Sequence, residues 1–188
     1  MANIANDPIP SQTTPKLREV EGIFFRSVLE NRVDEVLARP QPKSAGRYHR
    51  PGQATLYMSP IMEWAIIAVS GYIREDGHSR VVIPLKVSKA QVFDQHDNEA
   101  CQILGIDREL SNASWRPALE AGQDPASWRN ADAVRAIGAD GIIDRSRKIP
   151  DGWHLNLFRW NELGGPSVSV CGEPIAIELS SDGPKWGL

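Results

Sequence analysis

Hydrophobic and polar positions along this chain follow two periodicities, and the elements they predict come in an irregular order. Short runs of β-branched and aromatic residues, or apolar residues at every second position, predict strands. These predicted strands cover residues 22–28, 80–87, 141–144, 154–160, 168–170 and 175–179. In the strand at 154–160, Leu155 and Leu157 share one face, and His154, Asn156 and Phe158 share the other. Pro84 cannot donate a ladder hydrogen bond, so it predicts an edge or a bulge at 80–87.

A helix is predicted between Ser59 and Gly77. Ser59 is a good N-cap residue, Pro60 suits the first helical position, and Gly77 suits the turn that follows. Apolar residues then recur at helical spacing, which predicts that one face of this helix points inward. This face consists of Ile61, Trp64, Ala65, Ala68 and Tyr72.

The remaining elements complete an α+β pattern. We expect a helix within 107–119 and another over 130–136, closed by Gly138. Strands outnumber helices and do not alternate with them, which favours α+β over a doubly wound parallel sheet. We therefore expect one compact domain over 17–188, with mixed or antiparallel sheets and short helices. Residues 1–16 are polar and rich in proline, which predicts a mobile tail.

Composition narrows the class of protein. With 188 residues, 41% hydrophobic and 24% charged, the chain resembles an ordinary globular protein. Its formal net charge of −3 argues against a dedicated nucleic-acid binder. The longest apolar run, 64–69, is too short to cross a bilayer, and the first residues do not resemble a signal peptide. Cys101 and Cys171 lie far apart without a zinc-binding spacing, so we expect reduced thiols in a cytoplasmic protein.

A basic loop is the first candidate for chemistry. Between residues 36 and 62 the sequence has no acidic residue. Cationic donors beside flexible glycines can bind a diphosphate group. A basic loop is, however, often only a solvent-exposed segment with no ligand. The basic residues and glycines of this loop are Arg39, Lys43, Arg47, Arg50, Gly46 and Gly52.

Two segments carry a more specific signal. The first reads Gly-Arg-Tyr-His-Arg-Pro-Gly at 46–52 and continues to Leu-Tyr-Met-Ser at 56–59. The second reads Gly-Ile-Ile-Asp-Arg-Ser-Arg at 141–147 and continues to Trp-His-Leu-Asn-Leu-Phe at 153–158. Together they resemble the RES domain family, over roughly residues 20–160. This family comprises NAD-consuming toxins of bacterial toxin–antitoxin pairs, so the resemblance implies an ADP-ribosyltransferase-like fold, NAD as substrate and no metal.

The resemblance also implies roles for individual residues. Arg47 takes the place of the family Arg that holds NAD, and Tyr57 that of a Tyr lining the nicotinamide-ribose pocket. Arg26 resembles a second family Arg on the first strand. Ser146 matches the family Ser, although its local sequence is equally typical of a turn-forming serine. We expect Arg47, Tyr57 and Ser146 to converge on one cleft.

Ala68 is the departure from the family pattern, because it stands where the resemblance places a catalytic Glu. A carboxylate there would stabilise a cationic ribosyl transition state, which alanine cannot do. Three explanations are open. Ala68 is an inactivating substitution, or the subfamily has lost the reaction, or another acidic residue takes the role of the missing Glu. Glu63 lies about 140° from Ala68 around the helix and is expected to face away. Asp144, two residues from Ser146, is the other candidate.

The resemblance implies an Xre-type antitoxin partner that covers the cleft, and it leaves room for a homo-oligomer; neither a membrane nor direct nucleic-acid binding is expected. The rival interpretation is a catalytically silent RES-fold module that binds only a nucleotide or an antitoxin. Two further polar features are interpreted as structural. They are His154 on its strand and the cluster Asp94, His96 and Asp97, typical of a surface turn.

Overall fold

The computed structural model describes residues 14–178, in which strands and short helices follow one another without a regular alternation. In chain order the elements are β1 (Arg18–Leu29), η1 (Glu30–Glu35), β2 (Leu56–Met58), α1 (Met62–Asp76), β3 (Arg80–Asp94), α2 (Asn98–Leu104), α3 (Arg108–Asn112), α4 (Trp115–Glu120), α5 (Ala126–Ala136), β4 (Gly141–Arg145), β5 (Trp153–Leu157), β6 (Ser167–Val170) and β7 (Ile175–Ala176). Most of the predicted tail at 1–16 lies outside the described residues, as does Leu179.

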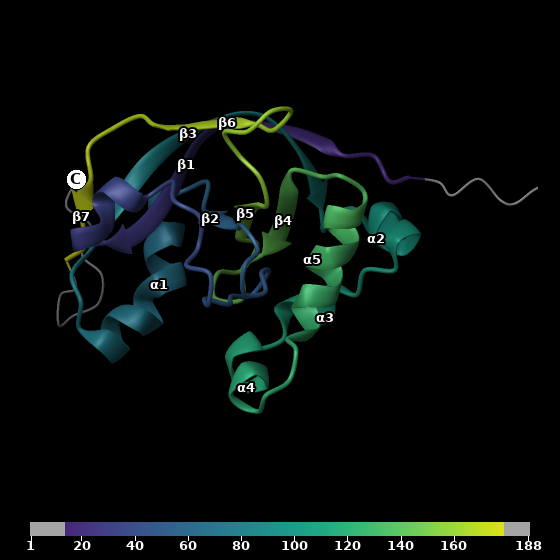
Figure 1. Ribbon diagram of the computed structural model, residues 1–188, viewed down its shortest axis with the longest axis horizontal. Coiled ribbons are helices and arrows are strands. Elements are labelled where there is room, and N and C mark those ends of the chain that lie inside the picture. The colour runs from purple at the N-terminus through teal and green to yellow at the C-terminus, as the bar shows by residue number, and fades with distance from the viewer. Residues whose placement is uncertain (1–13, 179–188) are drawn as a thin grey trace, which may run out of the picture.

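A mixed sheet organises the molecule (Figure 1). Its main path runs β1-β3-β4-β5-β2, and β6 and β7 also pair with β3. In the described part of the chain only β3 and β4 pair in parallel, and the other strand pairs are antiparallel. The helices α2 to α5 lie together beside β4, whereas α1 lies at the other side of β2 and β5 (Figure 1). The predicted α+β class is therefore confirmed.

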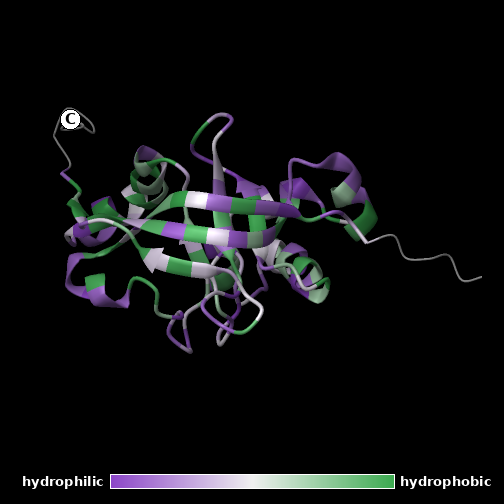
Figure 2. Cartoon of the chain, turned by 90° about the horizontal axis from the view of Figure 1, so that it is seen from above, coloured by the Kyte–Doolittle hydropathy of each residue, from purple (hydrophilic) through white to green (hydrophobic). Residues whose placement is uncertain are grey.

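Apolar residues along the strands build the core on either side of this sheet. Figure 2 shows hydrophobic and hydrophilic residues alternating along the strands. Leu85, Leu155 and Leu157 belong to the larger cluster and are fully buried. Burying such a side chain contributes about 1.5–3 kcal/mol. A second cluster packs Phe93 and Ile142 of the sheet against α2 and α5. The predicted alternation within 154–160 is confirmed, because Leu155 and Leu157 face the larger core.

The start of α1 differs from the prediction. Its N-cap is Ile61, not Ser59. Ser59 instead forms a two-way backbone bridge with Phe25 of β1, with N–O distances of 2.7 and 2.9 Å. Because its backbone and its hydroxyl are both engaged elsewhere, Ser59 anchors the segment between β2 and α1. The predicted end is confirmed, since Gly77 caps α1 in the left-handed conformation with φ 64°.

Pro84 does not mark an edge or a bulge. It lies in β3, which has neighbours on both sides, and it falls between the residues that pair with β7 and those that pair with β6. Its missing N–H therefore interrupts no pair there, and its carbonyl accepts a hydrogen bond from the Cys171 N–H at 3.0 Å. The register shift in this strand pair comes instead between Val20 and Gly22 of β1.

Two other helix predictions change. The segment 107–119 holds two short helices, α3 and α4, in place of one. The helix predicted over 130–136 begins earlier, at Ala126, and Gly138 follows it with φ 76°. Both cysteines are free, as expected, with Cys101 buried and Cys171 exposed. No helix between residues 14 and 178 is long and apolar enough to cross a membrane.

Candidate functional site

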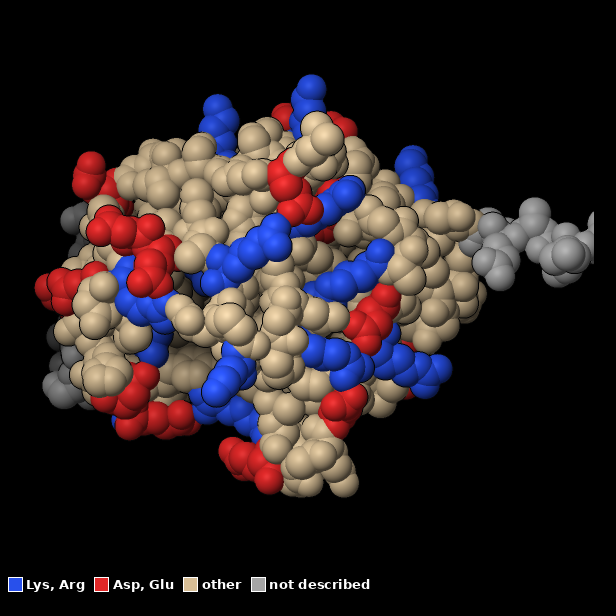
Figure 3. Space-filling model, viewed as in Figure 1, with Lys and Arg blue, Asp and Glu red and all other residues tan. Residues whose placement is uncertain are grey.

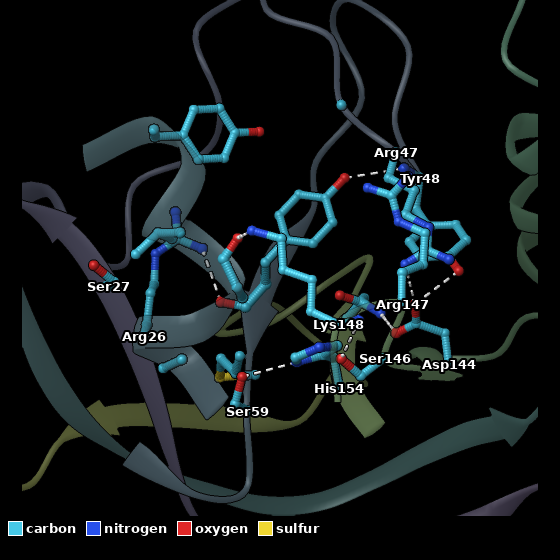
Figure 4. A pocket seen from close by; sticks show the side chains of 18 of the residues that line it. Arg26, Ser27, Arg47, Tyr48, Ser59, Asp144, Ser146, Arg147, Lys148 and His154 are labelled. Carbon is cyan, nitrogen blue, oxygen red and sulfur yellow. Dashed lines mark hydrogen bonds and ion pairs between the residues drawn. The ribbon is translucent and has the colours of Figure 1, made fainter. Parts of the chain in front are cut away.

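A pocket of about 370 Å³ opens between α1, the end of β1 and the loop that follows β4. Its floor comes from β2, β4 and β5, and the basic loop before β2 forms another wall (Figure 4). The predicted site residues Arg26, Arg47, Tyr57, Ala68 and Ser146 all line it. The expected convergence of Arg47, Tyr57 and Ser146 is therefore confirmed, while their roles stay predictions.

Sheet pairing explains this convergence. β5 lies between β2 and β4, so Tyr57 on β2 stands opposite Asn156 on β5. Asn156 in turn stands opposite Ile142, and Asp144 stands opposite His154. Alternate residues of these strands face the pocket because successive side chains point to opposite sides of a sheet. Ser146 follows one residue beyond the end of β4.

Arg47 is held in place by a buried polar network. One terminal guanidinium nitrogen pairs with the Asp144 carboxylate at 2.9 Å, and Nε donates to the Ser111 carbonyl at 2.8 Å. Asp144 also accepts hydrogen bonds from the Tyr48 hydroxyl at 2.9 Å and from the Asn156 amide at 2.7 Å. Most N–H donors of Arg47 are thus used within the protein. The negative charge of Asp144 is balanced by Arg47 and by two further hydrogen bonds.

Tyr57 belongs to a second network in the same loop. Its hydroxyl accepts a hydrogen bond from the Tyr48 N–H at 3.0 Å and lies 2.9 Å from His49 Nδ1. Burial lowers the pKa of His49 to about 4, with further contributions from Arg135 and Arg26, so this histidine is neutral at pH 7. Burial also raises the pKa of Tyr57. The Tyr57 hydroxyl and His49 Nδ1 thus share a hydrogen bond between two neutral groups, and its direction follows the tautomer of the ring.

Arg26 differs from Arg47 in its partners. It projects from β1 into the pocket (Figure 4) and donates one weak hydrogen bond, at 3.4 Å, to the Tyr57 carbonyl. Within residues 14–178, its Nε is buried without a hydrogen-bond partner, and the guanidinium forms no ion pair. Burial lowers its pKa to about 10, so it remains a cation at pH 7. A cation left unpaired in this way is ready to bind an anionic ligand.

Ser146 and the residues after it form the turn beyond β4. The Ser146 hydroxyl accepts hydrogen bonds from the backbone N–H groups of Lys148 and Ile149, at 3.3 and 3.2 Å. Ser146 therefore does both: its hydroxyl forms the turn, and the residue lines the pocket. The turn also brings Arg147 and Lys148 into the pocket wall (Figure 4).

α1 presents one apolar and aromatic face to the pocket. Ala65, Ala68, Val69 and Tyr72 line it, so the predicted inward face is confirmed at Ala65, Ala68 and Tyr72. It is not confirmed at Ile61, which is exposed, or at Trp64, which is not among the described residues that line the pocket. Lys148 Nζ lies over this face, 3.1 Å from the Ile67 carbonyl and 3.3 Å from the Ala68 carbonyl.

Neither candidate acid takes the place of the missing carboxylate. Glu63 is not among the described residues that line the pocket, as expected from its angle around α1. Asp144 does line it, but it already serves Arg47, Tyr48 and Asn156. Within residues 14–178 the pocket wall therefore offers no carboxylate without a partner.

Histidine 154 also lines the pocket, where its Nδ1 lies 2.8 Å from the Ser59 hydroxyl. Burial lowers its pKa. The cluster at 94–97 lies outside the pocket, since Asp94 pairs with Arg18 and His96, and Asp97 caps α2. The contacts of the 94–97 cluster agree with its structural interpretation, whereas the structural role of His154, which lines the pocket, stays a prediction.

Sequence reasoning assigned no role to Tyr48, Arg147 and Lys148. Tyr48 joins the Asp144 network, and the other two supply cations to the wall. The signal for the cations was present in the basic run from Arg145 to Lys148, directly after the matched Gly-Ile-Ile-Asp segment. As for metals, no group of three or more His, Cys, Asp or Glu side chains in the described part of the chain could hold one.

Comparison with known proteins identifies the family. The family model described as "RES domain" matches residues 18–176. Among solved structures, the crystal structure of the M. tuberculosis MbcT-MbcA toxin–antitoxin complex has a chain with the same fold: TM-score 0.58, 11% sequence identity, and 85% of each chain covered. This likeness confirms the compact α+β fold expected from the sequence. None of the curated proteins matches the chain. Since the family model spans most of the sequence, the chain belongs to the RES domain family.

Proposed function

We propose that this protein is the toxin component of a bacterial toxin–antitoxin system, and that it binds NAD and cleaves the nicotinamide–ribose bond. The observation that carries the proposal is the convergence of Arg26, Arg47, Tyr57 and Ser146 on one pocket. Membership of the RES family and a structural neighbour from a toxin–antitoxin complex support it. The partner would be an Xre-type antitoxin that covers the pocket, in the cytoplasm, and no metal would take part.

Each group around the pocket suits one part of the substrate. Arg26 has an unpartnered buried Nε and would bind the diphosphate through charge-assisted hydrogen bonds. Tyr57, fixed by the Tyr48 N–H and His49, would line the nicotinamide-ribose end. Ser146 would hydrogen-bond the ribose. Breaking the C–N bond releases neutral nicotinamide and leaves a ribosyl cation, which water, phosphate or a protein acceptor then captures.

The test is to incubate the purified full chain with NAD and to measure the released nicotinamide by chromatography. We expect release to depend on Arg26, and Arg26→Gln should weaken NAD binding by about tenfold or more, the loss of one charge-assisted contact. Arg39→Gln is the matched control, because Arg39 pairs with Glu162 at 2.6 Å outside the pocket. Equal NAD affinity in the two variants would remove Arg26 from the site.

A second candidate function is favoured by Ala68 and by the engagement of Asp144 in its own network. A pocket with no free carboxylate among residues 14–178 lacks a group to stabilise a ribosyl cation. The protein would then be a catalytically silent module that binds a nucleotide or an antitoxin. Calorimetry that detects NAD binding while no nicotinamide is released would favour this function over the first.

A further inference from the structure

The wall of the candidate pocket has an uneven charge. Four cationic side chains line it, Arg26, Arg47, Arg147 and Lys148, against one carboxylate, Asp144. His49 and His154 add no charge at pH 7, because burial lowers the pKa of both. The chain as a whole is acidic, with a net charge of −3, so the excess of cations is a local property. Figure 3 shows Lys and Arg side chains gathered across the centre of the face seen in Figure 1.

Asp144 offsets only one of these four charges. Its carboxylate pairs with Arg47 and is almost completely buried, so one of the four cations is already neutralised. In the described part of the chain, the other three form no ion pair. The free charge of the pocket is therefore carried by Arg26 on the β1 side and by Arg147 and Lys148 on the α1 side.

Lys148 has partners that leave its charge available. Its ammonium group contacts the carbonyls of Ile67 and Ala68 and the Ser70 hydroxyl. These carbonyls lie inside α1, where a helix carbonyl already accepts a backbone N–H. The side chain of Arg147, the preceding residue, forms no hydrogen bond to any other described residue. Two adjacent cations on the rim thus face the pocket without forming an ion pair, although Asp144 and Glu75 are near enough to favour their charged forms.

The pKa values agree with this geometry. Partial burial lowers the pKa of Arg147, and the nearby Arg47 lowers it further. Partial burial also lowers the pKa of Lys148, followed by the effect of Arg147. Asp144 and Glu75 act in the opposite direction but do not outweigh these effects, so each group is destabilised as a cation, and a bound anion would relieve the repulsion.

We infer that Arg147 and Lys148 form an anion subsite beside α1, and that the pocket therefore selects diphosphate ligands without a positive charge, of the ADP-ribose class, over NAD. The inference rests on the proposed function, since it concerns the same pocket. NAD and ADP-ribose share the diphosphate, but NAD adds a pyridinium cation. Three unpaired cations attract the diphosphate of both ligands and repel the pyridinium of one. Product would then bind more tightly than substrate.

Titration calorimetry with NAD and with ADP-ribose tests this, at constant ionic strength in a phosphate-free buffer. Arg147 and Lys148 are exposed, so each contributes modestly, and we expect the full chain to prefer ADP-ribose about three- to tenfold. Lys148→Met should reduce that preference by weakening ADP-ribose more than NAD, and Arg147→Gln should do the same. Lys148→Arg keeps the charge and should keep the preference.

Lys86→Met is the matched control, because Lys86 is exposed on β3 outside the pocket. Equal affinity of the unaltered protein for both ligands would overturn the inference and leave the NAD proposal standing. A preference that survives both Lys148→Met and Arg147→Gln would overturn the assigned subsite. If neither ligand binds, the proposed function falls as well. A thermal melt of each variant separates lost binding from lost folding.

Discussion

Arg47 and Asp144 form an ion pair of 2.9 Å in which the carboxylate side chain is only 1% exposed and the arginine 11%. The pair joins the loop before β2 to β4, and Tyr48 and Asn156 also bind the same carboxylate. A buried charge that loses its partner is strongly destabilised. The pair therefore fixes the basic loop to the sheet and gives the pocket one of its walls.

Removing this carboxylate should destabilise the protein. We expect Asp144→Ala to lower the free energy of unfolding by about 3–5 kcal/mol, because it leaves Arg47 buried without its counter-charge. Urea denaturation followed by fluorescence measures the change. Arg39→Ala is the control: it breaks the exposed pair with Glu162, which is typically worth less than about 1 kcal/mol. Similar losses in the two variants would show that the Asp144 pair does not hold the loop.

Gly46 should tolerate no side chain. A Cβ at this position would lie 2.7 Å from His49 Nδ1 and 2.8 Å from the Tyr57 hydroxyl oxygen, closer than real Cβ atoms come. We expect Gly46→Ala to lower the free energy of unfolding by about 1–3 kcal/mol, the usual cost of overpacking. It should also weaken NAD binding by displacing Tyr57.

Gly71→Ala is the matched control for this change. Gly71 lies within α1, and a Cβ there would meet its nearest heavy atom, Lys148 Nζ, at an ordinary 3.7 Å. Because alanine suits a helix better than glycine, we expect a gain of about 0.5–1 kcal/mol. Melting curves for both variants make the comparison. A stable Gly46→Ala protein with unchanged NAD affinity would contradict the tight packing around Tyr57.

Sequence patterns predicted the parts of this site that depend on local periodicity. Spacing along 59–76 correctly turned Ala65, Ala68 and Tyr72 toward the pocket, and alternation correctly separated Leu155 from His154. These predictions succeeded because one helical turn or one strand period determines which way each side chain points. The convergence of Arg47 and Ser146 was expected on another ground, the family resemblance of the two matched segments, and both residues line the pocket.

Contacts between distant segments could not be predicted in the same way. Ser59 has the composition of an N-cap, but its partners are Phe25 and His154, which only the assembled sheet brings near. Likewise, Asp144 was a candidate acid in sequence, whereas its place opposite Arg47 and Tyr48 makes it a structural anchor. Tertiary pairing overrides local preference at such positions.

Stability should fall in mild acid because of His49. Its folded-state pKa is about 4, below the ordinary 6.5, so the unfolded chain binds more protons between these values. The contribution is fully present above pH 6.5 and is lost as the pH falls toward 4. At about 1.4 kcal/mol per pKa unit, the shift of about 2.5 units amounts to at most about 3.5 kcal/mol. Unfolding free energies measured from pH 4.5 to 7 should therefore rise with pH.

The variant His49→Gln isolates this effect. It removes the titrating group while keeping a polar side chain near the Tyr57 hydroxyl, so its stability should change less over the same pH interval. His96→Gln is the control, since His96 is exposed and lies outside the pocket. A pH dependence that is equally steep in the His49 variant would assign the acid sensitivity to other groups.

Ala68→Glu should raise NAD cleavage, because position 68 lines the pocket and a carboxylate there would face the developing ribosyl cation. Folding should survive, since Lys148 Nζ already lies 3.3 Å from the Ala68 carbonyl and would be close enough to pair with the new carboxylate. We expect nicotinamide release to increase by about 100-fold or more, the size of effect that a positioned catalytic group commonly gives. Expression without an antitoxin should then arrest growth.

Ala68→Gln is the decisive control for that variant, because glutamine has the same shape without the charge. If both variants fold and only the Glu variant releases nicotinamide, the missing carboxylate explains a slow or silent parent protein. A folded Glu variant that is no more active than the Gln variant would favour the binding module, since position 68 would then not face the reacting bond. An unfolded Glu variant beside a folded Gln variant would mean that Lys148 does not compensate the buried charge, because the two differ in charge alone.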